Sequence, residues 1–211
     1  MNVKLISYTQ PTDPNITNLL ELVAYTARVS NPANQHNNAT AEKLVDYLIK
    51  HRHWSPLEMA DVTFEINCTR DIARQFIRHS SIKPQEFSQR YAKATEFEIS
   101  ECRLQDNNNR QNSLNTEDED LKLWWTTAQN EVIDKCNSLY NEALDKGIAK
   151  EVARKILPEG LTMSRLYMKG SLRSWLHYIE VRTHPSTQKE HREVANAIKQ
   201  ELQKVFPYKH E

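Results

Sequence analysis

The chain has 211 residues, enough for one domain with a substantial hydrophobic core. Lysine plus arginine equals aspartate plus glutamate at 28 each, so the formal net charge is zero, which argues against a protein that mainly coats nucleic acid. The only glycines are Gly147, Gly160 and Gly170, so no glycine-rich Rossmann or P-loop site can be built, and side chains or helix ends must hold any phosphate.

In the first third of the chain, residues 3–8 alternate and predict a strand, and apolar spacing predicts a helix over residues 16–29. Thr40 is placed to cap a second helix over residues 41–51, and the Ser-Pro-Leu-Glu of residues 55–58 is typical of a helix start.

The middle of the chain contains the clearest strand pattern, in which apolar and polar residues alternate over 62–68. Thr69 follows as the cap of a helix that ends at Arg78, and its three arginines share one face. Residues 80–91 read as irregular, residues 96–99 as a short strand, and the polar residues 105–120 as a mobile loop.

The last part of the chain is predicted to be mostly helical, with a long helix over 121–146 and a shorter one over 149–157. Residues 161–168 suggest a strand, and helices follow over 171–182 and 185–205. Strands are few and do not alternate with helices as βαβ units. We therefore expect an α+β fold, a helix-rich single domain over 1–211 with a small, mostly antiparallel sheet.

No run of about 18 apolar residues is present, and the start of the chain, MNVKLISYTQPTD, does not resemble a signal peptide. We therefore expect a cytoplasmic protein with no membrane or nucleic-acid partner. Cys68, Cys102 and Cys136 are odd in number and form no CxxC pair, so buried, reduced thiols are expected instead of nucleophiles.

Several other residues have simple structural interpretations. His51 and His53 are two positions apart without an evident third ligand, so no metal site is predicted. Trp124 and its neighbour Trp125 are expected to pack in the core or between subunits. His184 and His191 read as surface residues of a helix.

The strongest functional signal lies in residues 74–91, RQFIRHSSIKPQEFSQRY, where basic side chains outnumber acids. Arginine meets phosphate oxygens two at a time, and glutamine, serine and glutamate can fix a ribose or a polar ring. These residues suit a nucleotide pocket. The alternative is a salt-bridged surface loop in which Arg78 or Arg90 pairs with Glu86.

The same segment resembles the signature of the flavin-dependent thymidylate synthases (ThyX), which begins Arg-His-Arg and ends Asn-Glu-x-Ser-x-Arg-Tyr. The matching residues are Arg78, His79, Glu86, Ser88, Arg90 and Tyr91. Further matches occur in the right order at TARVS (26–30), HWSPLE (53–58), ARKILP (153–158) and LRS (172–174) through Arg182. Several motifs in order are much more specific than one.

The resemblance implies an enzyme, a homotetramer with FAD near its subunit interfaces. NADPH would reduce the flavin, and methylenetetrahydrofolate would supply the carbon that converts dUMP to dTMP. No cysteine attack on the ring is needed in this family, consistent with the lack of an activated cysteine here.

The resemblance also assigns positions in the site. Flavin-side positions are Ser30, Ser55, Glu58, Arg78, His79, Ser80, Glu86, Ser171, Arg173 and His177. Nucleotide positions are Gln75, Arg78, Glu86, Ser88, Gln89, Arg90, Arg154 and Arg182. Among the last set, Arg182 would stabilise charge that builds on the uracil ring, and Ser88 would orient the nucleotide without attacking it.

The chain departs from the family pattern at four positions. Ser80 replaces the second arginine of the signature, Lys83 a serine, Gln85 an asparagine, and Ser171 a common asparagine on the flavin side. Loss of an arginine is expected to weaken FAD binding unless Lys83 restores the charge.

These departures leave three alternatives to the synthase. The first is a divergent flavin-dependent hydroxymethylase of a pyrimidine nucleotide, and the second is a non-catalytic nucleotide-binding relative that has lost its flavin. The third is a helical nucleic-acid binder that uses the arginines of residues 70–78, which the zero net charge opposes.

Overall fold

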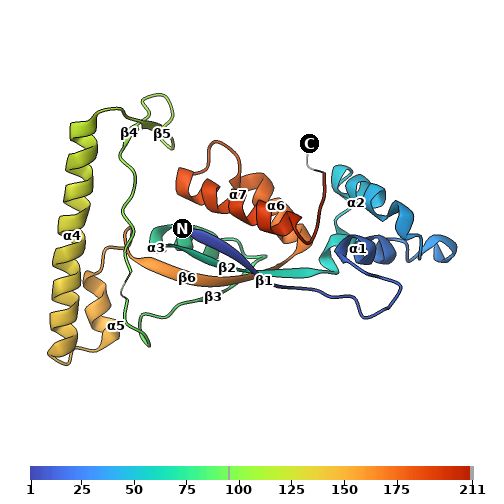
Figure 1. Cartoon of the computed structure of the whole chain (residues 1–211), viewed down its shortest axis with the longest axis horizontal. Helices are drawn as coiled ribbons and strands as arrows, with labels where there is room; N and C mark the ends of the chain where they lie inside the picture. Colours follow the sequence, from blue (N-terminus) through green and yellow to red (C-terminus); the bar gives the residue numbers. More distant parts are fainter. Residues whose placement is uncertain (95, 210–211) are drawn as a thin grey trace.

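The computed structural model describes residues 1–94 and 96–209. Its centre is a four-stranded antiparallel sheet in the order β1-β2-β6-β3. The strands are β1 (Asn2–Tyr8), β2 (Asp61–Thr69), β6 (Met163–Ser171) and β3 (Lys83–Glu86). Figure 1 shows helices above this sheet and at both of its ends. The predicted α+β class with a small antiparallel sheet is confirmed.

The alternating pattern of β2 turns one row of side chains into the core. Val62, Phe64 and Ile66 are fully buried, and in the antiparallel register Phe64 faces Met168 of β6. The side chains of β6 that point to the other face of the sheet, among them Arg165 and Lys169, are exposed. The sheet therefore has one dry face and one wet face, as such alternation predicts.

Three helices cover the dry face: α3 (Arg70–Ile77), α6 (Leu172–Arg182) and α7 (Lys189–Gln203). α6 is fixed to β2 by the buried Trp175, whose indole Nε1–H donates to the backbone oxygen of Val62 at 3.0 Å. Because α3 and α6 follow directly from β2 and β6, both helices begin at fixed points of the sheet.

At one end of the sheet lie α1 (Leu19–Ala27), α2 (Ala41–Lys50) and three short 3-10 helices, Pro32–Asn34, Asn38–Thr40 and Ser55–Glu58. The buried Arg28 joins them, since its guanidinium donates to the backbone oxygen of Asn37 at 2.6 Å and to the hydroxyl of Thr40 at 2.8 Å. Thr40 occupies the N-cap position of α2, as predicted, but its side chain makes no capping hydrogen bond to the helix.

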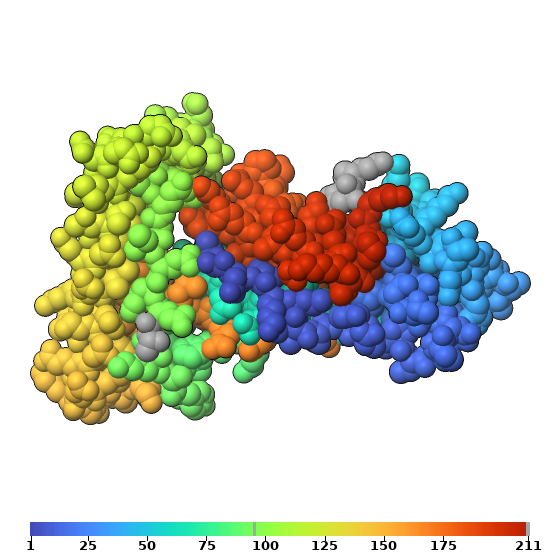
Figure 2. Space-filling view, in the orientation of Figure 1, coloured from blue at the N-terminus to red at the C-terminus, as the bar shows by residue number. Residues whose placement is uncertain are grey.

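At the other end, the long α4 (Glu119–Asp145) stands away from the sheet, followed by α5 (Lys150–Ala153) and the 3-10 helix Arg154–Ile156. A cleft of about 570 Å³ lies between α4 and α7, in the hollow seen in Figure 2. α4 leaves large apolar side chains in solvent, since Leu123 is 68% and Trp124 is 62% exposed. Trp124 therefore does not pack in the core of the chain, and the other expected place, between subunits, stays a prediction.

Some sequence expectations fail in the polar segments. Residues 80–91 include the edge strand β3, and the expected loop at 105–120 contains part of a hairpin formed by β4 (Arg103–Gln105) and β5 (Ser113–Asn115). The expected strand at 96–99 reduces to one bridge between Phe97 and Thr162. No helix in the described ranges 1–94 and 96–209 is long and apolar enough to cross a membrane.

Candidate active site

The ends of α3 and α6 bring His79 and Arg182 into contact. The Nε–H of Arg182 donates to Nε2 of His79 at 2.9 Å. Because arginine has no acceptor, this Nε2 carries no proton, and a neutral His79 presents its proton on Nδ1. Burial, followed by the charges of Arg182, His177 and Arg78, lowers the pKa of His79 to about 4. Four of the predicted site residues therefore form one electropositive group in which His79 is neutral.

Gln75 lies one turn before this group and is held by α7. Its Nε2 donates to Oε1 of Gln188 at 2.7 Å, and its Oε1 is 3.0 Å from Nδ1 of His191. The prediction that His191 is a surface residue is wrong: it is 0% exposed, and its ring lies 4.6 Å from that of Phe76, centroid to centroid. The sequence contains a signal for this burial, because His191 continues the apolar stripe formed by Val194, Ala195, Ile198 and Leu202.

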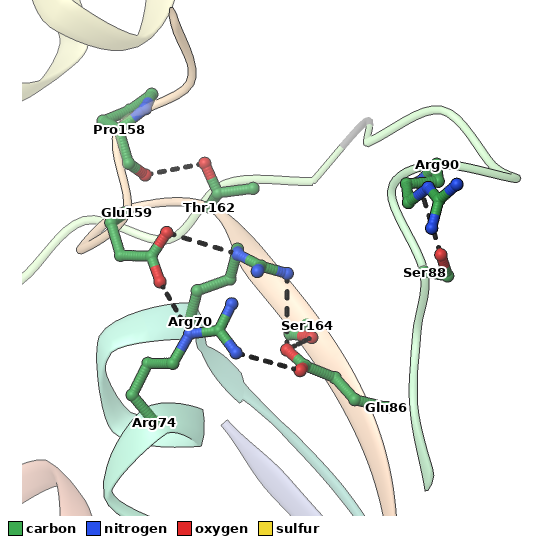
Figure 3. A network of polar contacts seen from close by, with 9 residues as sticks. All are labelled: Arg70, Arg74, Glu86, Ser88, Arg90, Pro158, Glu159, Thr162 and Ser164. Atoms are coloured by element: carbon green, nitrogen blue, oxygen red, sulfur yellow. Dashed lines mark hydrogen bonds and ion pairs between the residues drawn. The ribbon is translucent and has the colours of Figure 1, made fainter. Parts of the chain in front are cut away.

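Glu86, at the end of β3, is enclosed by cations from α3. Its two carboxylate oxygens are each 3.3 Å from a guanidinium, one of Arg70 and one of Arg74, and Ser164 of β6 donates to Oε1 at 3.0 Å. The same two arginines contact Glu159 at 3.4 and 3.1 Å, as Figure 3 shows. Glu86 is therefore a fixed acceptor whose charge is compensated within the chain.

This arrangement corrects the salt-bridged-loop alternative, which paired Glu86 with Arg78 or Arg90. The partners are Arg70 and Arg74, one helical turn apart on α3, and Arg70 is buried. Of the three arginines predicted to share one face of the helix, Arg70 and Arg74 do so and contact the same carboxylate. Arg78 is the C-cap of α3, and its charge helps to lower the pKa of the adjacent His79.

The segment after β3 carries a third group. The guanidinium Nε of Arg90 lies 3.2 Å from Oε2 of Glu151 on α5, and the backbone N–H of Arg90 donates to Oγ of Ser88 at 3.3 Å. Arg154 follows α5 directly. Figure 3 shows Ser88 and Arg90 to one side of the Glu86 network.

Gln89 differs from its neighbours because its side chain points inward. It is 3% exposed, and its Nε2 has no hydrogen-bond partner among the described residues. Residues 88–90 are all predicted to bind the nucleotide, but only Ser88 and Arg90 are accessible to solvent.

Half of the expected flavin-side residues lie on the 3-10 helix before β2 or on α6 and its N-cap. Arg173 contacts Glu58 at 2.9 Å, and His177, one turn further along α6, is exposed. Ser171 caps α6, since its hydroxyl accepts the N–H of Ser174 at 3.2 Å. Ser30 and Ser55 are exposed.

Lys83 lies close to Ser80 in space as well as in sequence. Its ammonium donates to the backbone oxygen of Ser80 at 2.6 Å. The structure therefore places a positive charge beside the position where the signature of the resembling family has an arginine.

The cysteines offer no nucleophile in this region. Cys68 is fully buried on β2, and burial raises the pKa of its thiol to about 12, so it stays protonated; the expectation of a buried spacer is confirmed for this residue. Cys102 and Cys136 are partly buried. Among the described residues, no group of three His, Cys, Asp or Glu side chains is arranged to hold a metal ion.

The single chain thus presents three separate groups, around His79, Glu86 and Arg90. The two clefts of about 570 and 560 Å³, beside α7 and between α2 and α6, are lined by other residues.

Comparison with known proteins identifies the family. Residues 4–208 match the family described as thymidylate synthase complementing protein. The probable flavin-dependent thymidylate synthase of Paramecium bursaria Chlorella virus 1 is 50% identical over 208 residues, which cover 98% of this chain and 96% of that protein. The flavin-dependent thymidylate synthase of Synechocystis sp. is 51% identical over 210 residues, with the same coverage.

A solved structure agrees with this result. The UMP/dUMP methylase PolB from Streptomyces cacaoi, bound with 5-Br dUMP, has a TM-score of 0.82 at 25% identity, over 97% of this chain and 90% of that chain. Sequence and fold agree, and the chain belongs to the thymidylate synthase complementing protein family, the family of the flavin-dependent thymidylate synthases.

Proposed function

We propose that this protein catalyses the FAD-dependent reductive methylation of dUMP to dTMP, with NADPH as the reductant and methylenetetrahydrofolate as the carbon donor. The observation that carries the proposal is the pairing of Arg182 with a neutral His79 beside Arg78, in a chain about half identical to flavin-dependent thymidylate synthases over nearly its whole length.

The donor set on this surface fits FAD. A flavin dinucleotide carries a pyrophosphate, and without glycine-rich loops its charge must be met by side chains. Arg78, Arg173 and Lys83 supply cations, and the N–H at Nδ1 of His79 is available as a neutral donor. Ser30, Ser55, Glu58 and His177 add polar groups at further flavin-side positions. When bound, the flavin would carry the reducing equivalents between NADPH and the one-carbon unit.

Arg182 has the properties required beside the uracil ring. Carbon 5 of uracil is a poor nucleophile until negative charge builds on the ring, and a fixed cation lowers the energy of that charge. The hydrogen bond to His79 occupies Nε of Arg182, which leaves the terminal nitrogens of the guanidinium to donate to a carbonyl oxygen of the ring. Arginine suits this role because it does not deprotonate.

Ser88, Arg90 and Arg154 would bind the sugar and phosphate of the nucleotide. The Arg90–Glu151 pair is largely exposed, at 59% and 55% for the two side chains, and exposed pairs are worth about 1 kcal/mol or less. A phosphate dianion that accepts two hydrogen bonds from one guanidinium can therefore displace Glu151. Gln75 and Glu86 would complete the nucleotide site, and the buried Gln89 would support Ser88 and Arg90 from within.

We further propose that the protein is a cytoplasmic homotetramer whose sites lie between copies. The separation of the candidate residues into three open groups supports this, because neighbouring copies can bring such groups together. The exposed Leu123 and Trp124 of α4 give an apolar surface of the kind that assembly buries. Light scattering on the purified protein tests the assembly, and a monomer at micromolar concentration would contradict it.

The product test separates the candidate activities. Purified protein is incubated with FAD, NADPH, methylenetetrahydrofolate and dUMP, and the nucleotide product is analysed by mass. A methylated product is expected, whereas a hydroxymethylated product would favour the divergent enzyme. A colourless protein that takes up no FAD on titration would favour a non-catalytic relative.

UMP is the informative second substrate. PolB is described as a methylase of both UMP and dUMP, and its fold matches this chain. Parallel reactions with UMP and dUMP therefore measure how strongly the proposed site prefers the deoxyribose.

A further inference from the structure

We propose that His191 is a positioning residue that fixes the amide of Gln75, so that Gln75 offers an N–H to the nucleotide while its carbonyl oxygen is occupied. This inference rests on the proposed function, in which Gln75 binds the nucleotide. It assigns a role to a buried histidine of α7 and predicts that the nucleotide atom contacted by Gln75 is an acceptor oxygen.

The orientation of the Gln75 amide can be traced from Glu190, whose carboxylate can only accept hydrogen bonds. One oxygen accepts from the guanidinium of Arg103, and the other accepts from Nε2 of Gln188 at 3.1 Å. Both Arg103 and Glu190 have largely buried side chains. This contact fixes the amide of Gln188 with its nitrogen toward Glu190 and its oxygen toward Gln75.

The orientation of the Gln188 amide in turn determines that of the Gln75 amide. Since Oε1 of Gln188 accepts, the atom of Gln75 at 2.7 Å from it must be Nε2. Oε1 of Gln75 therefore faces Nδ1 of His191, at 3.0 Å. Only a protonated Nδ1 can donate to a carbonyl oxygen, so the chain of contacts also determines the tautomer of His191.

His191 is suited to hold this orientation. Its ring is enclosed by Phe76 and Tyr178, at centroid distances of 4.6 and 5.8 Å. Burial lowers its pKa to about 3, so the ring stays neutral at physiological pH. Its Nε2, the unprotonated nitrogen of this tautomer, has no hydrogen-bond partner among the described residues.

The consequence concerns the second N–H of Gln75. A primary amide has two N–H groups, and Gln188 takes one of them. The other is the hydrogen-bonding group that Gln75 can present to a ligand, one turn before Arg78. A carbonyl or phosphate oxygen of the nucleotide satisfies it, whereas a ring N–H does not.

The test compares two replacements of His191. In His191→Asn the side-chain nitrogen takes the place of Nδ1 and can still donate to Gln75, whereas His191→Leu fills the space without a donor. We expect His191→Leu to raise the Kd for dUMP about tenfold, the effect of losing one hydrogen bond of about 1.4 kcal/mol. We expect His191→Asn to bind dUMP about as tightly as the unmodified protein, with FAD content unchanged in both variants.

Further variants complete the experiment. Gln75→Ala should weaken dUMP binding by a similar factor, and adding His191→Leu to it should cause no further loss, because the two residues act through one contact. His191→Met likewise fills the space without a donor, so it replaces His191→Leu if that variant does not fold. Gln200→Ala, a change at an exposed position of the same helix α7, is the matched control and should bind dUMP normally.

The outcomes separate the two proposals. If Gln75→Ala weakens dUMP binding but His191→Leu does not, or if Leu and Asn weaken it equally, the positioning role is wrong while the nucleotide site stands. If His191→Met is the variant in use, dUMP binding as tight as that of the unmodified protein has the same meaning. If Gln75→Ala itself binds dUMP normally, Gln75 does not contact the nucleotide, and both its assignment and the role of His191 are overturned.

Discussion

Acid should destabilise this protein through its buried histidines, and His191 allows the effect to be isolated. Its pKa is about 3 in the folded chain, lowered mainly by burial and further by the charges of Arg182 and His79, against an ordinary value of 6.5. Between these pH values the unfolded chain binds a proton that the folded chain does not. Lowering the pH through this window therefore favours unfolding, and the stability is fully present only above about pH 6.5.

The magnitude follows from the same values. At pH 5 the imidazole of the unfolded chain is almost fully protonated and that of the folded chain is not, which reduces the free energy of unfolding by about 2 kcal/mol relative to pH 8. His79, with its pKa lowered to about 4, acts in the same direction. A loss of this size is a large fraction of the stability of a typical domain.

Urea unfolding followed by circular dichroism at pH 8 and pH 5 measures this loss, at one fixed protein concentration because assembly also affects stability. In His191→Asn the side chain does not titrate but still donates to Gln75. Its fall in stability between the two pH values should be smaller than that of the unmodified protein by about 2 kcal/mol. Equal falls in the two proteins would refute the linkage to His191.

Three other substitutions have defined expectations. Arg182→Ala should abolish turnover while FAD stays bound, as seen in absorbance spectra and product assays, and retained activity would remove Arg182 from the catalytic role. Lys83→Ala should weaken FAD binding and reduce its salt dependence in titrations, because the ammonium lies beside Ser80; unchanged FAD affinity would show that Lys83 does not replace the missing arginine. Arg52 has a left-handed backbone with φ of 57°, so Arg52→Gly should raise the urea unfolding free energy by about 1 kcal/mol, and a decrease would contradict the assigned strain.

The regular parts of the fold were predictable because their apolar residues follow one period over a long stretch. β2 was clear from its strict alternation, and α4 and α6 from their helical spacing. β3 was not, because Lys-Pro-Gln-Glu is polar and exposed and pairs along one side only, with β6. Proline is tolerated at such an edge, but nothing in the local sequence indicates a strand.

The residues of the site were predictable in kind, and their partners were not. The signature positions came from motif order, whereas the pairing of Glu86 with Arg70 and Arg74 depends on how β3 lies against α3. The burial of His191 does not follow from the polarity of histidine, although its helical position falls on the apolar stripe of α7. Local patterns do not specify which elements meet.

The proposed function requires guanidinium groups from separate parts of the chain to converge on one nucleotide. A crystal structure of the assembled protein with FAD and dUMP would reveal whether they do. We expect that Arg78, Arg90, Arg154 and Arg182, from one or neighbouring copies, all lie within hydrogen-bonding distance of the same nucleotide. A nucleotide bound elsewhere, with these arginines on unrelated surfaces of the assembly, would contradict it.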